Sequence, residues 1–191
     1  MPNAEIDWNR QLFDQWDWHW VNQVRPRLVG LTDDEYFWEP VSDCWSVRPV
    51  DQVRTRQKTG SGPYRLEFEW PGPTPVPVTT IAWRIGHIIE GCLLQRSADH
   101  FGGEPFNRDE FPYAPTADAA LDQFDAAYAR WSTGVRALGD EGLARPCGPA
   151  EGPFAETPLA GLILHINKEL IHHCAEVALL RDLYLRLGPT H

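Results

Sequence analysis

The feature that most constrains the fold is a recurrence of apolar side chains every three or four positions. The clearest case lies between Thr116 and Gly139, where the spacings alternate between four and three. This spacing places the apolar residues on one face of an α-helix. Thr116 suits the N-cap, and Gly139 suits the left-handed position that follows a helix. The members of this stripe are Ala117, Leu121, Phe124, Tyr128, Trp131, Val135 and Leu138.

Three other segments carry the same pattern, so that helices are predicted over about residues 6–28, 80–100, 116–139 and 157–187. The first has a core-facing stripe formed by Phe13, Trp16, Trp20, Val24 and Leu28. Residues that favour helix ends are Thr79 or Thr80 before the second helix, Gly102 and Gly103 after it, Thr157 and Pro158 at the start of the fourth, and Gly188 and Pro189 at its end. Four amphipathic helices with one long connection predict an all-α fold, an antiparallel four-helix bundle that forms a single domain over residues 1–191.

The long connection between the first two helices, residues 30–77, is the least regular part of the chain. Seven prolines interrupt it. Within it, the segment YRLEFEW at residues 64–70 alternates apolar and charged side chains. That alternation predicts a short strand or one arm of a hairpin.

Charge and composition exclude several classes of partner. The net charge is -10, and the only lysines are Lys58 and Lys168. Binding to nucleic acid or to an anionic membrane is not expected, because both need a basic surface. No apolar run approaches the length of a membrane span, and the first ten residues do not resemble a secretory signal. The four cysteines form no C-x-x-C motif, so we expect a cytoplasmic protein with reduced thiols.

Two ionisable residues interrupt the apolar stripe of the fourth helix. Glu169 and His173 are four residues apart, so their side chains lie on the same face. A carboxylate among apolar groups must pair or bind a cation, and two ligands at this spacing form a common half-site for a metal. A hydrogen-bonded Glu–His pair without a metal is the simpler alternative. The apolar members of the stripe are Leu162, Ile166, Val177, Leu180 and Tyr184.

The best candidate for a third metal ligand is His87, on the second helix. Alone, it would more often be a core histidine with a hydrogen-bond partner. Together with Glu169 and His173 it would complete a His–Glu–His set that leaves one coordination position open. His165 and His172 are interpreted as a solvated edge or as groups that support the ligands, and His172 competes with its neighbour His173.

The remaining residues and motifs carry weaker signals. His19 is expected on the surface, His100 and His191 need no role, and Cys174 is expected to be packed. Glu169 and His172 make the one Glu-x-x-His motif, whereas a ferritin-like di-iron centre needs two. The sequence contains no H-E-x-x-H, G-x-S-x-G, Walker or G-x-G-x-x-G motif.

Four segments together resemble the DinB-like superfamily of metal-binding four-helix bundles. They are RPRLVGLTDDEYFWEPV, CWSVRP, TTIAWRIGHI and HINKELIHHCAE. The resemblance implies a divalent metal, with zinc expected first and nickel, manganese or iron left open, bound by His87, Glu169 and His173. Many members have histidine where this chain has Glu169. A glutamate at that place resembles the branch of mycothiol-dependent maleylpyruvate isomerases.

The same resemblance implies chemistry with a low-molecular-weight thiol of the mycothiol type. A thiol S-transferase or isomerase would act on a small-molecule electrophile, and a homodimer is expected from relatives. Two alternatives stay open. One is a metal-dependent hydrolase that uses bound water, with Glu90 or Glu176 as the base. The other is a non-catalytic bundle that binds a metal or ligand.

Overall fold

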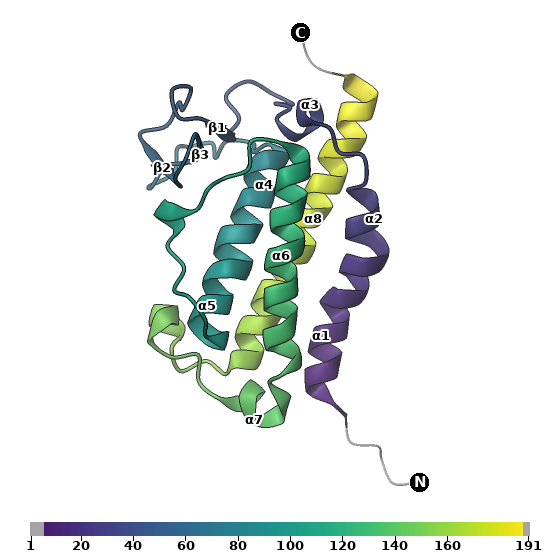
Figure 1. The fold of residues 1–191 in the computed structure, drawn as a ribbon, viewed down its shortest axis with the longest axis vertical. Helices are drawn as coiled ribbons and strands as arrows, with labels where there is room; N and C mark the ends of the chain where they lie inside the picture. The colour runs from purple at the N-terminus through teal and green to yellow at the C-terminus, as the bar shows by residue number, and fades with distance from the viewer. Residues whose placement is uncertain (1–5, 189–191) are drawn as a thin grey trace.

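The computed structural model describes residues 6–188. Four long helical stretches make up most of it (Figure 1). The stretches that begin with α1 and α4 each contact both α6 and α8. Their elements are α1 (Trp8–His19), η1 (Trp20–Val24) and α2 (Arg25–Arg27); α4 (Ile81–His87), η2 (Ile88–Leu94) and α5 (Gln95–Phe101); α6 (Ala117–Arg136); and α8 (Leu159–Leu187). The prediction of a mainly helical fold is therefore confirmed.

The predicted caps are mostly in place. The hydroxyl of Thr80 accepts a hydrogen bond from the backbone N–H of Trp83 at 3.2 Å, and Thr116 does the same for Ala119 at 3.3 Å. Gly102 and Gly139 have positive φ angles of 78° and 61°. Gly102 ends α5 as the sequence predicts, whereas α6 ends earlier, with Ala137 as its C-cap, and Gly139 begins the short helix α7 (Gly139–Ala144).

Two other details of the helix ends differ from the prediction. The first helix begins at Trp8 rather than residue 6, because Asp7 accepts from the N–H of Arg10 and acts as the N-cap. Pro158 rather than Thr157 occupies the N-cap position of α8. Thr157 is held in the preceding turn, since its carbonyl accepts from the N–H of Cys147. The predicted stop at Pro189 lies outside the described residues, whereas Gly188 follows α8 directly.

Several short elements were not predicted from the sequence. Two are π-helical turns, η1 and η2, which continue the first and second helices without a break. The apolar spacing continues through both turns, so it did not reveal them. The others are α3 (Asp33–Tyr36), η3 (Arg108–Glu110), α7 (Gly139–Ala144) and η4 (Pro149–Phe154).

The long connection folds into a small sheet, which corrects the expectation of an all-α chain with at most a hairpin. The strands β1 (Val47–Pro49), β2 (Gln57–Thr59) and β3 (Tyr64–Phe68) are antiparallel in the order β1-β3-β2. The predicted strand at residues 64–70 becomes the central one. Its buried Leu66 pairs with Val47 on one side and Thr59 on the other. The sheet contacts α4 through β1 and β3 (Figure 1).

A buried carboxylate fixes the sheet in place. Glu67 has no solvent-exposed surface and accepts hydrogen bonds from the N–H of Ser46 at 3.0 Å and of Arg54 at 2.6 Å. The Nε of Arg48 donates to the same carboxylate at 2.9 Å. The carbonyl of Glu67 accepts from the indole Nε1 of Trp83 at 2.7 Å. The sheet is thereby tied to α4, the helix that ends at His87.

Gly60 offers a test of the contact between the sheet and the loop before α6. Its φ is +106°, and a Cβ there would lie 2.5 Å from the ring of Tyr113 and 2.9 Å from the carbonyl oxygen of Phe111. We expect Gly60→Ala to lower the free energy of unfolding by about 1–3 kcal/mol, measured by urea denaturation. Gly62→Ala is the control, because Gly62 also has positive φ but a Cβ added there would meet no atom within 4 Å. Equal losses in both variants would contradict the predicted clash.

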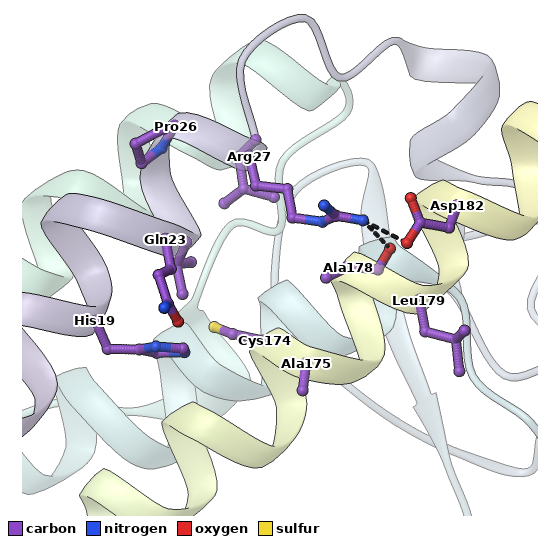
Figure 2. A pocket seen from close by; sticks show the side chains of 11 residues that line it. His19, Gln23, Pro26, Arg27, Cys174, Ala175, Ala178, Leu179 and Asp182 are labelled. Atoms are coloured by element: carbon purple, nitrogen blue, oxygen red, sulfur yellow. Dashed lines mark hydrogen bonds and ion pairs between the residues drawn. The ribbon is translucent and has the colours of Figure 1, made fainter.

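A cavity of about 780 Å³ lies between the first helical stretch and α8 (Figure 2). Arg27 crosses it to reach Asp182 and the carbonyl of Ala178. Buried Cys174, packed as predicted, lines it together with the half-buried His19. No group of three potential metal ligands was found there among residues 6–188.

Among residues 6–188, no helix is both long enough and apolar enough to cross a lipid bilayer.

Candidate metal centre

The three residues singled out as ligands lie together between the second and fourth helical stretches. One ligand atom from each of His87, Glu169 and His173 lies within 4.8 Å of the other two. The Nε2 of His173 is 3.5 Å from Oε2 of Glu169. The two imidazole rings are 5.0 Å apart between centroids and nearly perpendicular, at 85°. The structure therefore brings His87 next to Glu169, although the two residues are 82 positions apart in the sequence.

This geometry fits a single small cation. Two atoms that each lie about 2.1 Å from one tetrahedral ion are roughly 3.4 Å apart. The Glu169–His173 separation of 3.5 Å is close to that value. Two imidazole nitrogens and one carboxylate oxygen suit zinc, and they also suit iron, nickel or manganese.

His87 is held in a neutral form by its surroundings. It is the last residue of α4 and directly precedes the π-helical turn η2, a type of turn that is frequent at functional sites. Its ring stacks on Trp83 at 5.2 Å and 20°. Burial, together with the nearby imidazole of His173, lowers the pKa of His87 to about 4. A neutral imidazole can offer a lone pair to a cation at neutral pH.

His173 is oriented by a carboxylate on its other side. Its Nδ1 lies 2.8 Å from Oε2 of Glu176, one turn further along α8. Glu176 in turn forms an ion pair with Arg84 of α4. An imidazole that donates from Nδ1 to a carboxylate keeps the lone pair on Nε2, which is the nitrogen that faces Glu169.

Glu169 stays ionised in this setting. Partial burial opposes its charge, but Lys168, His165 and His173 outweigh that effect and lower the pKa of Glu169. Its Oε1 lies 3.2 Å from Nζ of Lys168, and Oε2 remains directed at His173. The site thus combines one carboxylate oxygen with two imidazole nitrogens.

An open cleft of about 410 Å³ adjoins His87 and Glu169. Glu90 and Arg108 line it and form an ion pair at 3.1 Å. Burial raises the pKa of Glu90. A molecule in this cleft would lie beside two of the three candidate ligands, His87 and Glu169.

A model of the DinB superfamily matches residues 15–177, which span all four helical stretches. The chain belongs to the DinB superfamily. Searches of curated proteins and of solved structures found no significant match. The superfamily match supports the resemblance noted in the sequence, and the ligand roles of the three residues remain predictions.

The other histidines of this DinB superfamily member occupy different settings. His165 and His172 are exposed on α8, as expected of a solvated edge. His172 also forms a group with His173 and Glu176 whose ligand atoms lie within 4.8 Å of one another. Because Glu176 already pairs with Arg84 and with Nδ1 of His173, we interpret this group as support for His173.

The sequence pattern did not reveal the roles of two residues, Arg84 and His100, that pair with carboxylates from other segments. Arg84 was not singled out, although it lies three positions before His87. His100, expected to need no role, is buried and its Nε2 lies 2.8 Å from Oε1 of Glu151. Neither contact follows from spacing along one helix, because each joins segments that are far apart in the chain.

The contact between His173 and Glu176 leads to a prediction about metal affinity. Glu176→Gln removes the charge that favours the Nδ1–H form of His173, so we expect zinc to bind about 10-fold more weakly. Competition with a chromogenic chelator measures this affinity. Glu156→Gln removes an exposed charge elsewhere and serves as the control. Unchanged affinity in Glu176→Gln would show that Glu176 does not support a metal ligand.

Proposed function

We propose that this DinB superfamily protein is a metal-dependent transferase that joins a low-molecular-weight thiol to a small electrophile, with His87, Glu169 and His173 as the metal ligands. The observation that carries the proposal is the convergence of these donors beside an open cleft. We also infer that the helical stretches form the antiparallel four-helix bundle of the superfamily. The contacts of both the α1 and the α4 stretch with α6 and α8 support that inference.

A bound cation would favour the thiolate form of a thiol that occupies the coordination position left open by the three protein ligands. The protein side chains would do the remaining work. His87 and His173 would provide nitrogen donors, and Glu169 would provide a compensating negative charge. Arg108 lines the cleft with a partly exposed guanidinium, which can hold a polar group of the electrophile.

The proposed reaction forms a carbon–sulfur bond and breaks the bond between that carbon and its leaving group. The leaving group departs with the bonding electron pair, and the thiol proton passes to solvent. In an isomerase, the thiol would instead add reversibly and leave again, so that no thiol is consumed.

The test is turnover of a generic aryl halide electrophile with mycothiol and added zinc. We expect product formation that requires both the thiol and the metal and that disappears in His173→Ala. Isomerisation of a cis-unsaturated keto acid with the same thiol tests the isomerase. Absence of turnover with every thiol in both assays would reject thiol chemistry for this protein.

A metal-dependent hydrolase is the second candidate, and the position of Glu90 supports it. Glu90 is buried beside the cleft, and burial raises its pKa, which makes the carboxylate a stronger proton acceptor. Glu176, the other base considered from the sequence, is engaged by Arg84 and His173. Zinc-dependent hydrolysis of an activated ester without any thiol, lost in Glu90→Gln, would favour this candidate.

A further inference from the structure

A second cavity adjoins the cleft at the candidate metal centre. It has a volume of about 260 Å³, and Arg96 and His165 line both spaces. Its other walls come from the segment before α8 and from the first turn of that helix. They are Cys147, Glu151, Phe154, Thr157, Gly161 and Leu162. The two cavities therefore meet along a shared boundary.

The charges at this boundary are already compensated. The carboxylate of Glu151 is 7% exposed and lies 2.7 Å from NH1 of Arg96 and 2.8 Å from Nε2 of His100. The rest of the wall is an apolar or neutral surface, which includes the ring of Phe154, 67% exposed. Nε of Arg96 is buried without a hydrogen-bond partner, but an uncharged apolar group would bury its surface against the rest of this wall.

The wall is held in place before any ligand binds. The N–H of Cys147 donates to the carbonyl of Thr157 at 2.9 Å, and that of Gly148 donates to Ala155 at 2.8 Å. Arg145 donates from its guanidinium to the carbonyl of His100 at 2.6 Å. These bonds tie the segment to itself and to α5, so a ligand need not organise it.

We propose that this second cavity binds the apolar tail of a ligand whose polar head lies at His87, Glu169 and His173. This inference rests on the proposed metal site and adds a substrate class to it. The ligand would be an elongated, uncharged hydrocarbon or aryl group carried by a metal-binding or electrophilic head. Ligands without such a tail would bind only through the head.

Alkyl hydroxamates test the inference, because the hydroxamate head binds zinc whatever its tail. Affinities of the zinc-loaded protein for acetohydroxamate and for its butyl, hexyl and octyl homologues are measured by calorimetry. We expect affinity to rise about three- to fourfold for each buried methylene until the cavity is full. Without zinc, we expect no binding by any member.

Two variants fill the cavity by different routes. Cys147→Phe adds a ring from the loop, and Gly161→Leu adds a side chain from α8, where an added Cβ would lie 2.8 Å from the methyl of Thr157 and would displace it. Both variants should leave the affinity for acetohydroxamate unchanged and should abolish the rise of affinity with chain length. Ala175→Leu, which adds similar bulk beside the separate cavity of Figure 2, should retain the gain.

The possible failures are distinguishable. No binding of any hydroxamate, acetohydroxamate included, would overturn both the metal site and the tail cavity. Binding that does not depend on chain length would overturn the tail cavity alone. If affinity still rises with chain length in both Cys147→Phe and Gly161→Leu, or rises without zinc, the tail binds elsewhere. That result would also overturn the tail cavity.

Discussion

Replacing His173 with alanine is expected to lower zinc affinity by more than about 100-fold, because it removes a nitrogen ligand from the candidate centre. His87→Ala should have a similar effect. Glu169→Gln should weaken binding less, since the amide oxygen can still approach the ion but carries no charge. Zinc content after purification without a chelator, followed by chelator competition, measures all three variants.

The matched control for His173→Ala is His172→Ala. The two residues are adjacent on α8, but His172 is exposed while His173 faces His87 and Glu169. We expect His172→Ala to bind zinc normally. The reverse result, with loss only in His172→Ala, would move the site to the outer face of α8. Normal loading in both His173→Ala and Glu169→Gln would reject the proposed ligands.

Replacing Glu67 with alanine is expected to lower the free energy of unfolding by about 3–5 kcal/mol, because it leaves two N–H donors without their acceptor and removes one of the two carboxylates that pair with Arg48. The guanidinium of Arg48 would lose the carboxylate at 2.9 Å. The N–H groups of Ser46 and Arg54 would lose their acceptor. Urea denaturation followed by tryptophan fluorescence measures this loss.

Glu69→Ala is the control for Glu67→Ala. Glu69 lies just after the same strand, is partly exposed, and pairs loosely with the exposed Arg56 at 3.8 Å. We expect Glu69→Ala to lower the free energy of unfolding by about 1 kcal/mol or less. The buried network would be unimportant if the two variants lost equal stability.

Much of the helical framework could be predicted because it depends on local rules. A hydroxyl side chain can cap a helix through a contact with an N–H only three residues further along the chain, and Thr80 and Thr116 do so here. The spacing of four between Glu169 and His173 likewise places both side chains on one face of α8 without reference to any other segment. The start of α8 was predicted one residue too early. The carbonyl of Thr157 accepts a hydrogen bond from the N–H of Cys147, ten positions earlier in the chain, and this contact could not be read from the spacing around the cap.

The sequence by itself determined which faces of the helices are apolar and which two ionisable groups share one of those faces, because side-chain direction in a helix follows from position alone. Only the tertiary structure decided that His87 meets this pair, that Arg84 and Glu176 orient His173, and that Glu67 joins the sheet to α4. Each of these contacts depends on how separate segments pack. Packing is set by the shape and burial of the whole core, which no short spacing in the chain records.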